Sequence, residues 1–163
     1  TGDGKGKTTA ALGLAVRAAG AGLRVFIGQF VKGMEYSEIK ALARFGDLVM
    51  VRQYGRGCFI RGKPEEADIR AAALGLEEVR QAFSTGEFKV VILDEANIAT
   101  YFKLFSVDDL LALIDVKPAP IELVITGRNA DRRVIERADL VTEMREIRHY
   151  YARGIEARAG IES

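Results

Sequence analysis

The first nine residues, TGDGKGKTT, constrain the fold of this chain more than any other stretch. Their three glycines let the backbone curl where a Cβ would clash, so that successive N–H groups point at one anion. Lys7 can reach the terminal phosphates of a nucleotide, and the Thr8 hydroxyl can ligate Mg²⁺. The apolar run after Thr9 predicts a helix whose positive end faces the same anion. We therefore predict a phosphate-binding loop whose nucleotide-binding residues are Gly2, Asp3, Gly4, Lys5, Gly6, Lys7, Thr8 and Thr9.

The match to the pattern G-x-x-x-x-G-K-[ST] is incomplete. Thr1 stands at the first glycine position, and Gly2 follows one residue later. The alternative interpretation is a glycine-rich turn that caps an ordinary helix. We prefer phosphate binding, because GKGKTT adds a lysine and two hydroxyls where phosphate and metal require them. The loop indicates a nucleotide and leaves its reaction open.

Helix and strand signals alternate along the chain. Apolar periodicity and helix-terminal signals predict helices over residues 8–19, 37–45, 64–84, 110–114 and 131–137. Apolar runs predict strands over residues 24–31, 48–53, 89–93, 121–126 and 140–144. Ser106–Asp109 is a variant capping box ahead of the fourth helix, and residues 149–163 show no clear periodicity. This order predicts an α/β fold with a mostly parallel sheet and helices on both faces, the P-loop NTPase (RecA-like) fold.

The start of the sequence is unusual for this fold class. A phosphate loop normally follows a buried strand, and here the chain begins at the loop. We expect that a first strand and an N-terminal segment precede Thr1 in the complete protein. Residues 1–163 are expected to form a single nucleotide-binding domain.

Charged residues follow the predicted strands, at the edge where ligands bind in such sheets. Asp94 and Glu95 end the apolar run VVIL, so either carboxylate can hold Mg²⁺ opposite Thr8; the alternative is a solvated acid pair. Arg128 follows Thr-Gly at the next strand end and is a candidate phosphate anchor, with a plain surface arginine as the alternative. Lys32 is placed similarly and is a weaker candidate.

Composition limits the partners and the compartment. There are 24 basic and 23 acidic side chains, and this balance argues against electrostatic binding of nucleic acid or of a membrane surface. One cysteine allows no intrachain disulfide, and no signal peptide or spanning segment is recognisable, so we expect a cytoplasmic protein. His149 is the only histidine, and a lone histidine is more often structural than catalytic. No Ser-His-Asp order stands out. The residues alone thus indicate a Mg-nucleotide enzyme or switch.

Several stretches together resemble the P-loop type of ATP:corrinoid adenosyltransferase, which makes adenosylcobalamin. They span nearly the whole chain in the family's order, and the tail is the most telling: TGDGKGKTTAAL (1–12), QFVKG (29–33), LDE (93–95), ITGR (125–128), ADLVTE (138–143) and GIEARAGIE (154–162).

The resemblance implies transfer of the 5′-deoxyadenosyl group of ATP to cobalt(I) of a corrinoid, with release of triphosphate. Lys7 and Arg128 would act catalytically by offsetting charge on the leaving group, with Mg²⁺ held by Thr8 and by Asp94 or Glu95. A reductase such as a flavoprotein would supply the reduced corrinoid, and the family's tendency to dimerise predicts a homodimer. No protein nucleophile is needed.

One stretch departs from the family. Its Gly-x-Gly-Phe-Thr-Trp segment corresponds to residues 55–60, where only Phe59 is aromatic. Two other functions stay open at this point. A RecA-like P-loop kinase or ATPase would release ADP, whereas a nucleotide-gated binding module would lose its partner on Lys7→Ala and show no turnover.

Overall fold

A four-stranded parallel sheet forms the centre of the computed structural model, which describes residues 1–34, 36–57 and 63–162. Its strand order is β2-β1-β3-β4. The strands are β1 (Val25–Phe30), β2 (Val49–Tyr54), β3 (Val90–Asp94) and β4 (Glu122–Ile125). Every neighbouring pair is parallel, with Val25 opposite both Val49 and Val90. The predicted α/β class with a parallel sheet is confirmed.

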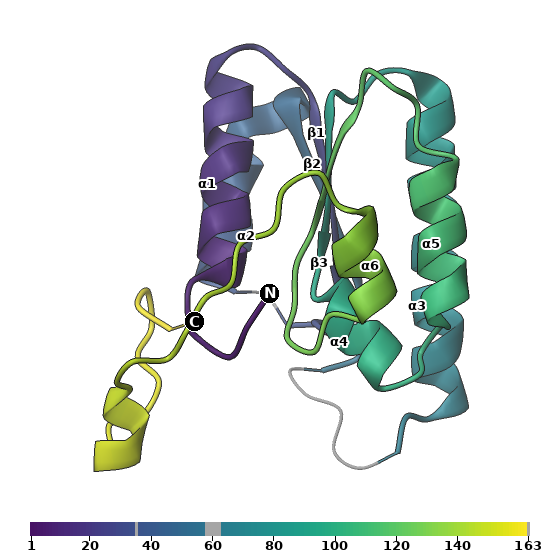
Figure 1. Ribbon diagram of the computed structural model, residues 1–163. Helices are drawn as coiled ribbons and strands as arrows, with labels where there is room; N and C mark the ends of the chain where they lie inside the picture. The colour runs from purple at the N-terminus through teal and green to yellow at the C-terminus, as the bar shows by residue number, and fades with distance from the viewer. Residues whose placement is uncertain (35, 58–62, 163) are drawn as a thin grey trace.

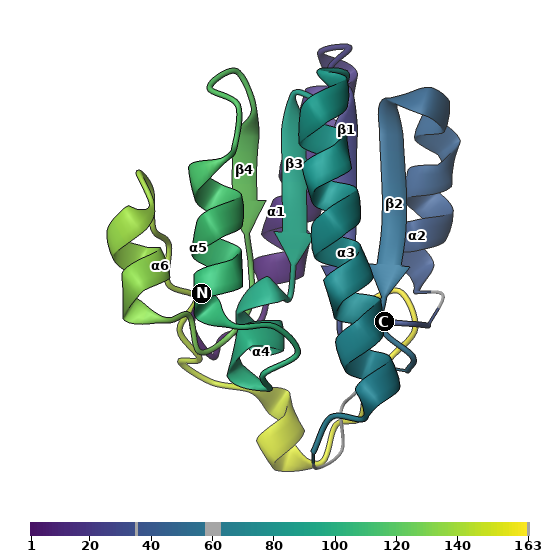
Figure 2. The same cartoon turned by 90° about the vertical axis from the view of Figure 1, so that its right-hand side faces the viewer.

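Helices cover both faces of the sheet, as predicted (Figures 1 and 2). One face carries α1 (Lys7–Gly20), α2 (Ser37–Leu42) and the 3₁₀ helix η1 (Ala43–Leu48). The other carries α3 (Glu66–Thr85), α4 (Ala96–Tyr101), α5 (Val107–Asp115) and α6 (Arg132–Arg137). The short η2 (Tyr150–Arg153) lies in the tail, below the carboxyl ends of the strands.

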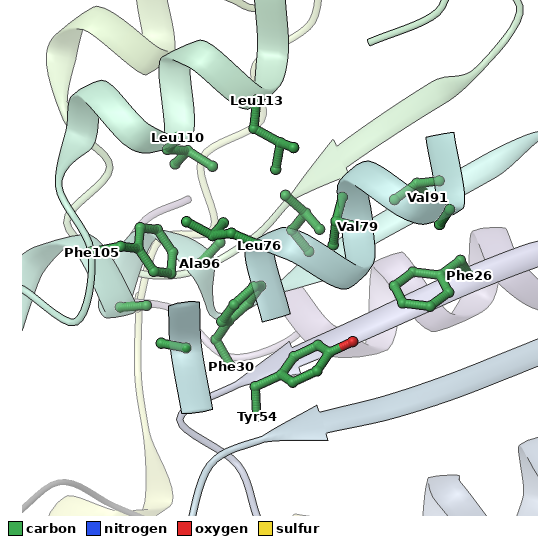
Figure 3. Close-up of a cluster of buried hydrophobic side chains, with 14 of the residues drawn as sticks. Phe26, Phe30, Tyr54, Leu76, Val79, Val91, Ala96, Phe105, Leu110 and Leu113 are labelled. Atoms are coloured by element: carbon green, nitrogen blue, oxygen red, sulfur yellow. The ribbon is translucent and has the colours of Figure 1, made fainter. Parts of the chain in front are cut away.

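Alternation along the strands divides the core into two apolar clusters. In β1, Val25 and Ile27 pack toward α1, whereas Phe26 and Phe30 pack toward α3 and α5. Figure 3 shows the second cluster, where the Phe30 ring meets Phe105 edge-on at 5.2 Å between centroids. Because β1 and β3 are buried on both faces, their sequences read as continuous apolar runs rather than as alternating ones.

Most predicted helix boundaries hold to within two residues, because capping signals mark them. Ser106 and Asp109 form a reciprocal capping box ahead of α5, as predicted. Glu65 and Asp68 form another at the start of α3. The predicted helix 37–45 is wrong in its second half: α2 ends at Leu42, and a 3₁₀ segment follows whose Gly46 has a φ of 56°. Helix α4 was not predicted, since it has only six residues and no acidic residue in its first turn.

The predicted strand over residues 140–144 is also wrong: the segment is extended but joins no sheet. Among the described residues its backbone bonds to the start of the loop: Thr1 N donates to Thr142 O at 2.8 Å, Met144 N donates to Thr1 O at 2.8 Å, and Gly4 N donates to Met144 O at 2.7 Å. That spacing is the pattern of a parallel pair, but one residue makes no ladder. A cavity of about 380 Å³ lies between this segment, β4 and α1. The physical reason for the wrong prediction is that none of the described strands lies beside this segment to pair with it.

The tail lies close to the phosphate loop in both views (Figures 1 and 2). Residues 58–62, which include Cys58, Phe59 and Ile60 of the stretch that departs from the family, are outside the described residues. Among the residues that are described, no helix combines the length and apolar character that crossing a membrane requires.

Candidate nucleotide-binding site

The glycine-rich loop is wedged against the backbone of residues 143–145. Gly4 N donates to Met144 O at 2.7 Å, and a Cβ on Gly2 would lie 2.4 Å from that same oxygen. Gly2 and Gly6 have φ values of 93° and 110°, which only glycine adopts without strain. Gly2 and Gly6 thus permit a positive φ, and Gly2 and Gly4 permit close approach to the backbone of residues 143–145.

The end of α1 that faces the loop is electropositive. Helix α1 begins at Lys7, has no side-chain cap on its N-cap Gly6 and carries no acidic residue in its first turn. The first N–H groups of a helix lack intrahelical partners, and its dipole is positive at that end. Thr9 is exposed in this first turn and Asp3 is exposed in the loop. The loop and the helix end together suit an anion.

Lys7 lies inside the curl of the loop. Its Nζ donates to Gly2 O and to Gly4 O, each at 2.6 Å. Partial burial lowers the pKa of this ammonium, and the neighbouring Arg128 charge lowers it further. Two carbonyl oxygens satisfy the lysine in the absence of an anion, so it is held at the loop's centre, where phosphate oxygens would replace them.

Asp94, at the end of β3, is the centre of the polar network. Its side chain is completely buried, and each carboxylate oxygen accepts two hydrogen bonds. Oδ1 accepts from Thr8 Oγ1 at 2.9 Å and from Thr126 Oγ1 at 2.7 Å. Oδ2 accepts from Gln29 Nε2 at 3.2 Å and from Lys32 Nζ at 2.8 Å. The predicted pairing of Thr8 with an acid after β3 is therefore present in the geometry.

Lys32 is closer to the site than its weak sequence signal suggested. Its Nζ lies 2.8 Å from Asp94 Oδ2 and 3.1 Å from Thr8 Oγ1, with the side chain 16% exposed. It therefore bridges the two residues expected to hold Mg²⁺. Hydroxyl and carboxylate oxygens that converge on one cation are the donor chemistry that Mg²⁺ prefers, so these residues fit the ion.

Glu95 is strained and partly desolvated. It has a φ of 61° as the N-cap of α4, a conformation that costs a non-glycine residue free energy. Burial raises the pKa of its carboxyl above the usual value, and the Asp94 charge raises it further. The positive charges of Lys32, Lys7 and Arg128 act in the opposite direction.

Arg128 is exposed after the sharp turn that ends β4. Gly127 has a φ of 130°, and a Cβ there would lie 3.0 Å from the Asn97 Cβ. Asn97 is almost completely buried and donates to Gly127 O at 3.4 Å. This turn places Arg128 near enough to Lys7 and Glu95 to influence both pKa values.

The tail contacts the loop through Lys5. Lys5 Nζ donates to Tyr150 Oη, to Ile161 O and to Glu162 Oε1, each at 3.0 Å. Tyr150 also donates to the Glu162 carboxylate. The cations and hydroxyl around Glu162 hold the pKa of its carboxyl far below the usual range, with the Arg158 guanidinium the largest cause. The lone histidine has a structural role here: His149 Nδ1 accepts from Tyr151 N and caps η2.

Sequence reasoning undervalued three side chains. Gln29 and Thr126 were quoted only as parts of motifs, and each donates to Asp94. Gln29 is fully buried and also accepts from Gln53 Nε2 at 3.1 Å. One signal was available: a glutamine inside the apolar run RVFIGQFV must find a partner once it is buried. The tail residue Glu162 carried no comparable signal.

A glycine-rich loop that faces a buried acid across the carboxyl edge of a parallel sheet is the arrangement that defines the P-loop NTPase-like fold, and this chain has that fold. The profile of the family described as "ATP:corrinoid adenosyltransferase BtuR/CobO/CobP" matches residues 1–163. The chain belongs to this family and is a transferase, as the resemblance predicted.

Curated relatives agree with the family assignment. The corrinoid adenosyltransferase of Pseudomonas aeruginosa is 36% identical over 163 residues, which cover 99% of this chain and 80% of the relative. The protein of the same name from Sinorhizobium sp is 34% identical, covering 99% and 77%. Corrinoid adenosyltransferase CobA of Salmonella typhimurium is 31% identical, covering 99% and 82%.

Proposed function

We propose that this protein transfers the 5′-deoxyadenosyl group of ATP to the cobalt(I) centre of a reduced corrinoid. In this reaction the cobalt electron pair forms the bond to C5′, the C5′–O bond breaks, and inorganic triphosphate leaves with that bonding pair. Family membership supports the reaction class. The observation that carries the proposal for the ATP side is the convergence of Lys7, Thr8 and Asp94 beside the glycine-rich loop.

The protein's task in this reaction is to bind and neutralise the triphosphate. The loop N–H groups and the positive end of α1 would bind its oxygens. Lys7 would exchange its two carbonyl partners for phosphate oxygens. Exposed Arg128 would approach the same anion from the end of β4. Each positive group then stabilises charge that grows on the leaving oxygen.

Thr8 and Asp94 are the proposed holders of Mg²⁺, with Glu95 as an additional carboxylate. When bound, the ion would neutralise part of the triphosphate charge. Asp94 is the acid in contact with Thr8, and Gln29 and Thr126 fix its orientation. Glu95 is the next residue and has the cations Lys7, Lys32 and Arg128 around it.

Product analysis of the phosphate chain tests the function. ATP, Mg²⁺ and chemically reduced cobalamin should yield a light-sensitive cobalt–carbon product together with one triphosphate per adenosyl group. ADP and phosphate without that product would instead indicate the kinase or ATPase alternative, and no turnover would indicate the binding module. Lys7→Met should remove activity, whereas Lys89→Met, at the exposed position that precedes β3, should retain it.

We further propose that the protein works in the cytoplasm as a homodimer, with a reductase such as a flavoprotein supplying the cobalt(I) substrate. The reaction requires an electron donor to the corrinoid, and the adenosyl transfer itself supplies none. Light scattering after size exclusion tests the dimer; a single peak at the monomer mass over the working concentration range would contradict it.

A further inference from the structure

Lys32 occupies the position between the Thr8 hydroxyl and the Asp94 carboxylate. We infer that Lys32 is a place-holder cation: its ammonium holds the metal position while the nucleotide is absent and is expelled when the metal arrives with triphosphate. This inference rests on the proposed function, because it takes Thr8 and Asp94 as the metal-holding pair. It adds an order of events to that function: the ammonium leaves the site as metal and triphosphate bind together.

The ammonium and a metal ion would compete for the same oxygens. The ammonium nitrogen is 3.1 Å from Thr8 Oγ1 and 2.8 Å from Asp94 Oδ2. Mg²⁺ binds oxygen at roughly 2.0–2.1 Å and is surrounded by about six ligands. An ion in contact with both Thr8 and Asp94 would therefore overlap the ammonium or face it at a distance where two positive charges repel strongly.

Burial explains why a cation is needed there at all. Asp94 is completely buried, and its other three donors are the neutral Thr8, Thr126 and Gln29 side chains. A buried carboxylate without a counter-charge is expensive. Lys32 supplies that charge in the nucleotide-free protein, and a divalent ion would take over the same task.

The backbone around Lys32 directs its side chain into the site. Val31 has a φ of 64°, which is a true outlier for a β-branched residue and marks a position where the surrounding structure imposes strain. The next turn is tightly packed, since a Cβ on Gly33 would lie 2.2 Å from Gly55 O and Gly33 N donates to Gly57 O at 2.7 Å. The lysine thus leaves β1 from a fixed turn rather than from a free loop.

Lys32 is not fully enclosed. Its side chain keeps 16% of its surface exposed, and its Nζ lies 5.7 Å from the centre of the Tyr36 ring, within the range of a cation–π contact. In this inference the ammonium leaves the two oxygens by a side-chain rotation toward solvent. Triphosphate supplies the negative charge that makes the exchange favourable, because it attracts the metal and the displaced ammonium alike.

Metal binding without nucleotide gives the test. Mn²⁺ serves as the probe for the Mg²⁺ position, and the bound fraction is measured by electron paramagnetic resonance with and without inorganic triphosphate. Wild type and Lys89→Met should bind Mn²⁺ only when triphosphate is present. Lys32→Met should bind Mn²⁺ without triphosphate at least about ten-fold more tightly than wild type, which corresponds to about 1.4 kcal/mol. Asp94→Asn should abolish binding in both conditions.

The outcomes separate this inference from the proposed function. If triphosphate fails to bring Mn²⁺ to the wild type, the proposed metal site is wrong. If it succeeds, but folded Lys32→Met and Lys32→Gln show no gain in Mn²⁺ affinity without triphosphate, the place-holder role is wrong and the metal site stands. Lys32→Gln is the second variant because it keeps a polar donor beside Asp94; circular dichroism checks that both are folded.

Discussion

Removing one charge of the Asp94–Lys32 pair should destabilise the nucleotide-free protein strongly, and removing both should cost little more. The two groups are 2.8 Å apart, with exposed side-chain fractions of 0% for Asp94 and 16% for Lys32. Breaking a buried ion pair by removing one partner costs about 3–5 kcal/mol. Because Lys32 retains a path to water, we expect about 2–4 kcal/mol of unfolding free energy for Asp94→Asn or Lys32→Met alone.

The double variant measures the pairing itself. With both charges removed, neither partner is left uncompensated, so its loss should be about 3 kcal/mol rather than the sum of the single losses. The coupling free energy should then be about 3 kcal/mol, at the upper end of the range measured for contacting residues. For a chain of this length each kcal/mol shifts the melting temperature by about 2–4 °C, so each single variant should melt about 4–16 °C lower.

Urea unfolding followed by circular dichroism, in chelator and without nucleotide, is the assay. A matched control cycle uses Arg132 and Glu136 of α6, which lie 2.6 Å apart but have exposed side-chain fractions of 88% and 57%. That exposed pair should show a coupling of only about 0.3–0.5 kcal/mol. Coupling at Asp94 and Lys32 no larger than the control value would refute the argument that burial makes this pair strong.

Three further predictions concern other parts of the structure. Gly2→Ala should weaken triphosphate binding, measured by calorimetry, and should lower the unfolding free energy by about 1–3 kcal/mol, because its φ is positive and an added Cβ would meet backbone atoms. As a control, Gly13→Ala in the open interior of α1 should raise the unfolding free energy by about 0.5–1 kcal/mol. The raised pKa of Glu95 in the folded protein means that ionisation of this carboxyl opposes folding. Its contribution to the unfolding free energy is most favourable below about pH 4.5 and is lost as the pH rises through the folded-state pKa. In urea titrations between pH 5 and pH 8, Glu95→Gln should therefore be more stable than the wild type. Glu162→Gln should speed tryptic cleavage of the tail, seen by mass spectrometry, since it weakens the contacts to the loop; an unchanged rate would count against them.

The sheet could be predicted because the burial of its central strands is visible in their own sequences. β1 and β3 are covered on both faces, and a continuous apolar run bounded by turn signals is the direct consequence in the sequence. The loop could be predicted for a different reason, since its glycines, lysine and threonine act within nine residues of one another. Both signals are local, so both can be recognised without knowing which distant segments pack against them.

The parts that could not be predicted depend on distant segments. Residues 140–144 have the composition of a strand, but a strand also needs a paired neighbour, and in the described residues their backbone bonds only to the loop residues Thr1 and Gly4. Helix α4 depends on Glu95 adopting a left-handed conformation, which no local pattern indicates. Lys32 had only a weak signal because its partner Asp94 lies 62 positions away in the sequence.

Burial of the acid at the end of β3 connects these observations. The strands are parallel, so the residues that follow them meet at one edge, and Gln29 faces Asp94 in the register of β1 and β3. Asp94 is too deeply buried to be solvated, so an ionised side chain there requires both donors and a counter-charge in every state of the protein. A nucleotide-bound state can supply that charge with a metal ion; a nucleotide-free state has to supply it from the chain. Lys32, which follows the neighbouring strand β1, supplies that charge at 2.8 Å from the same buried carboxylate that is proposed to hold a metal.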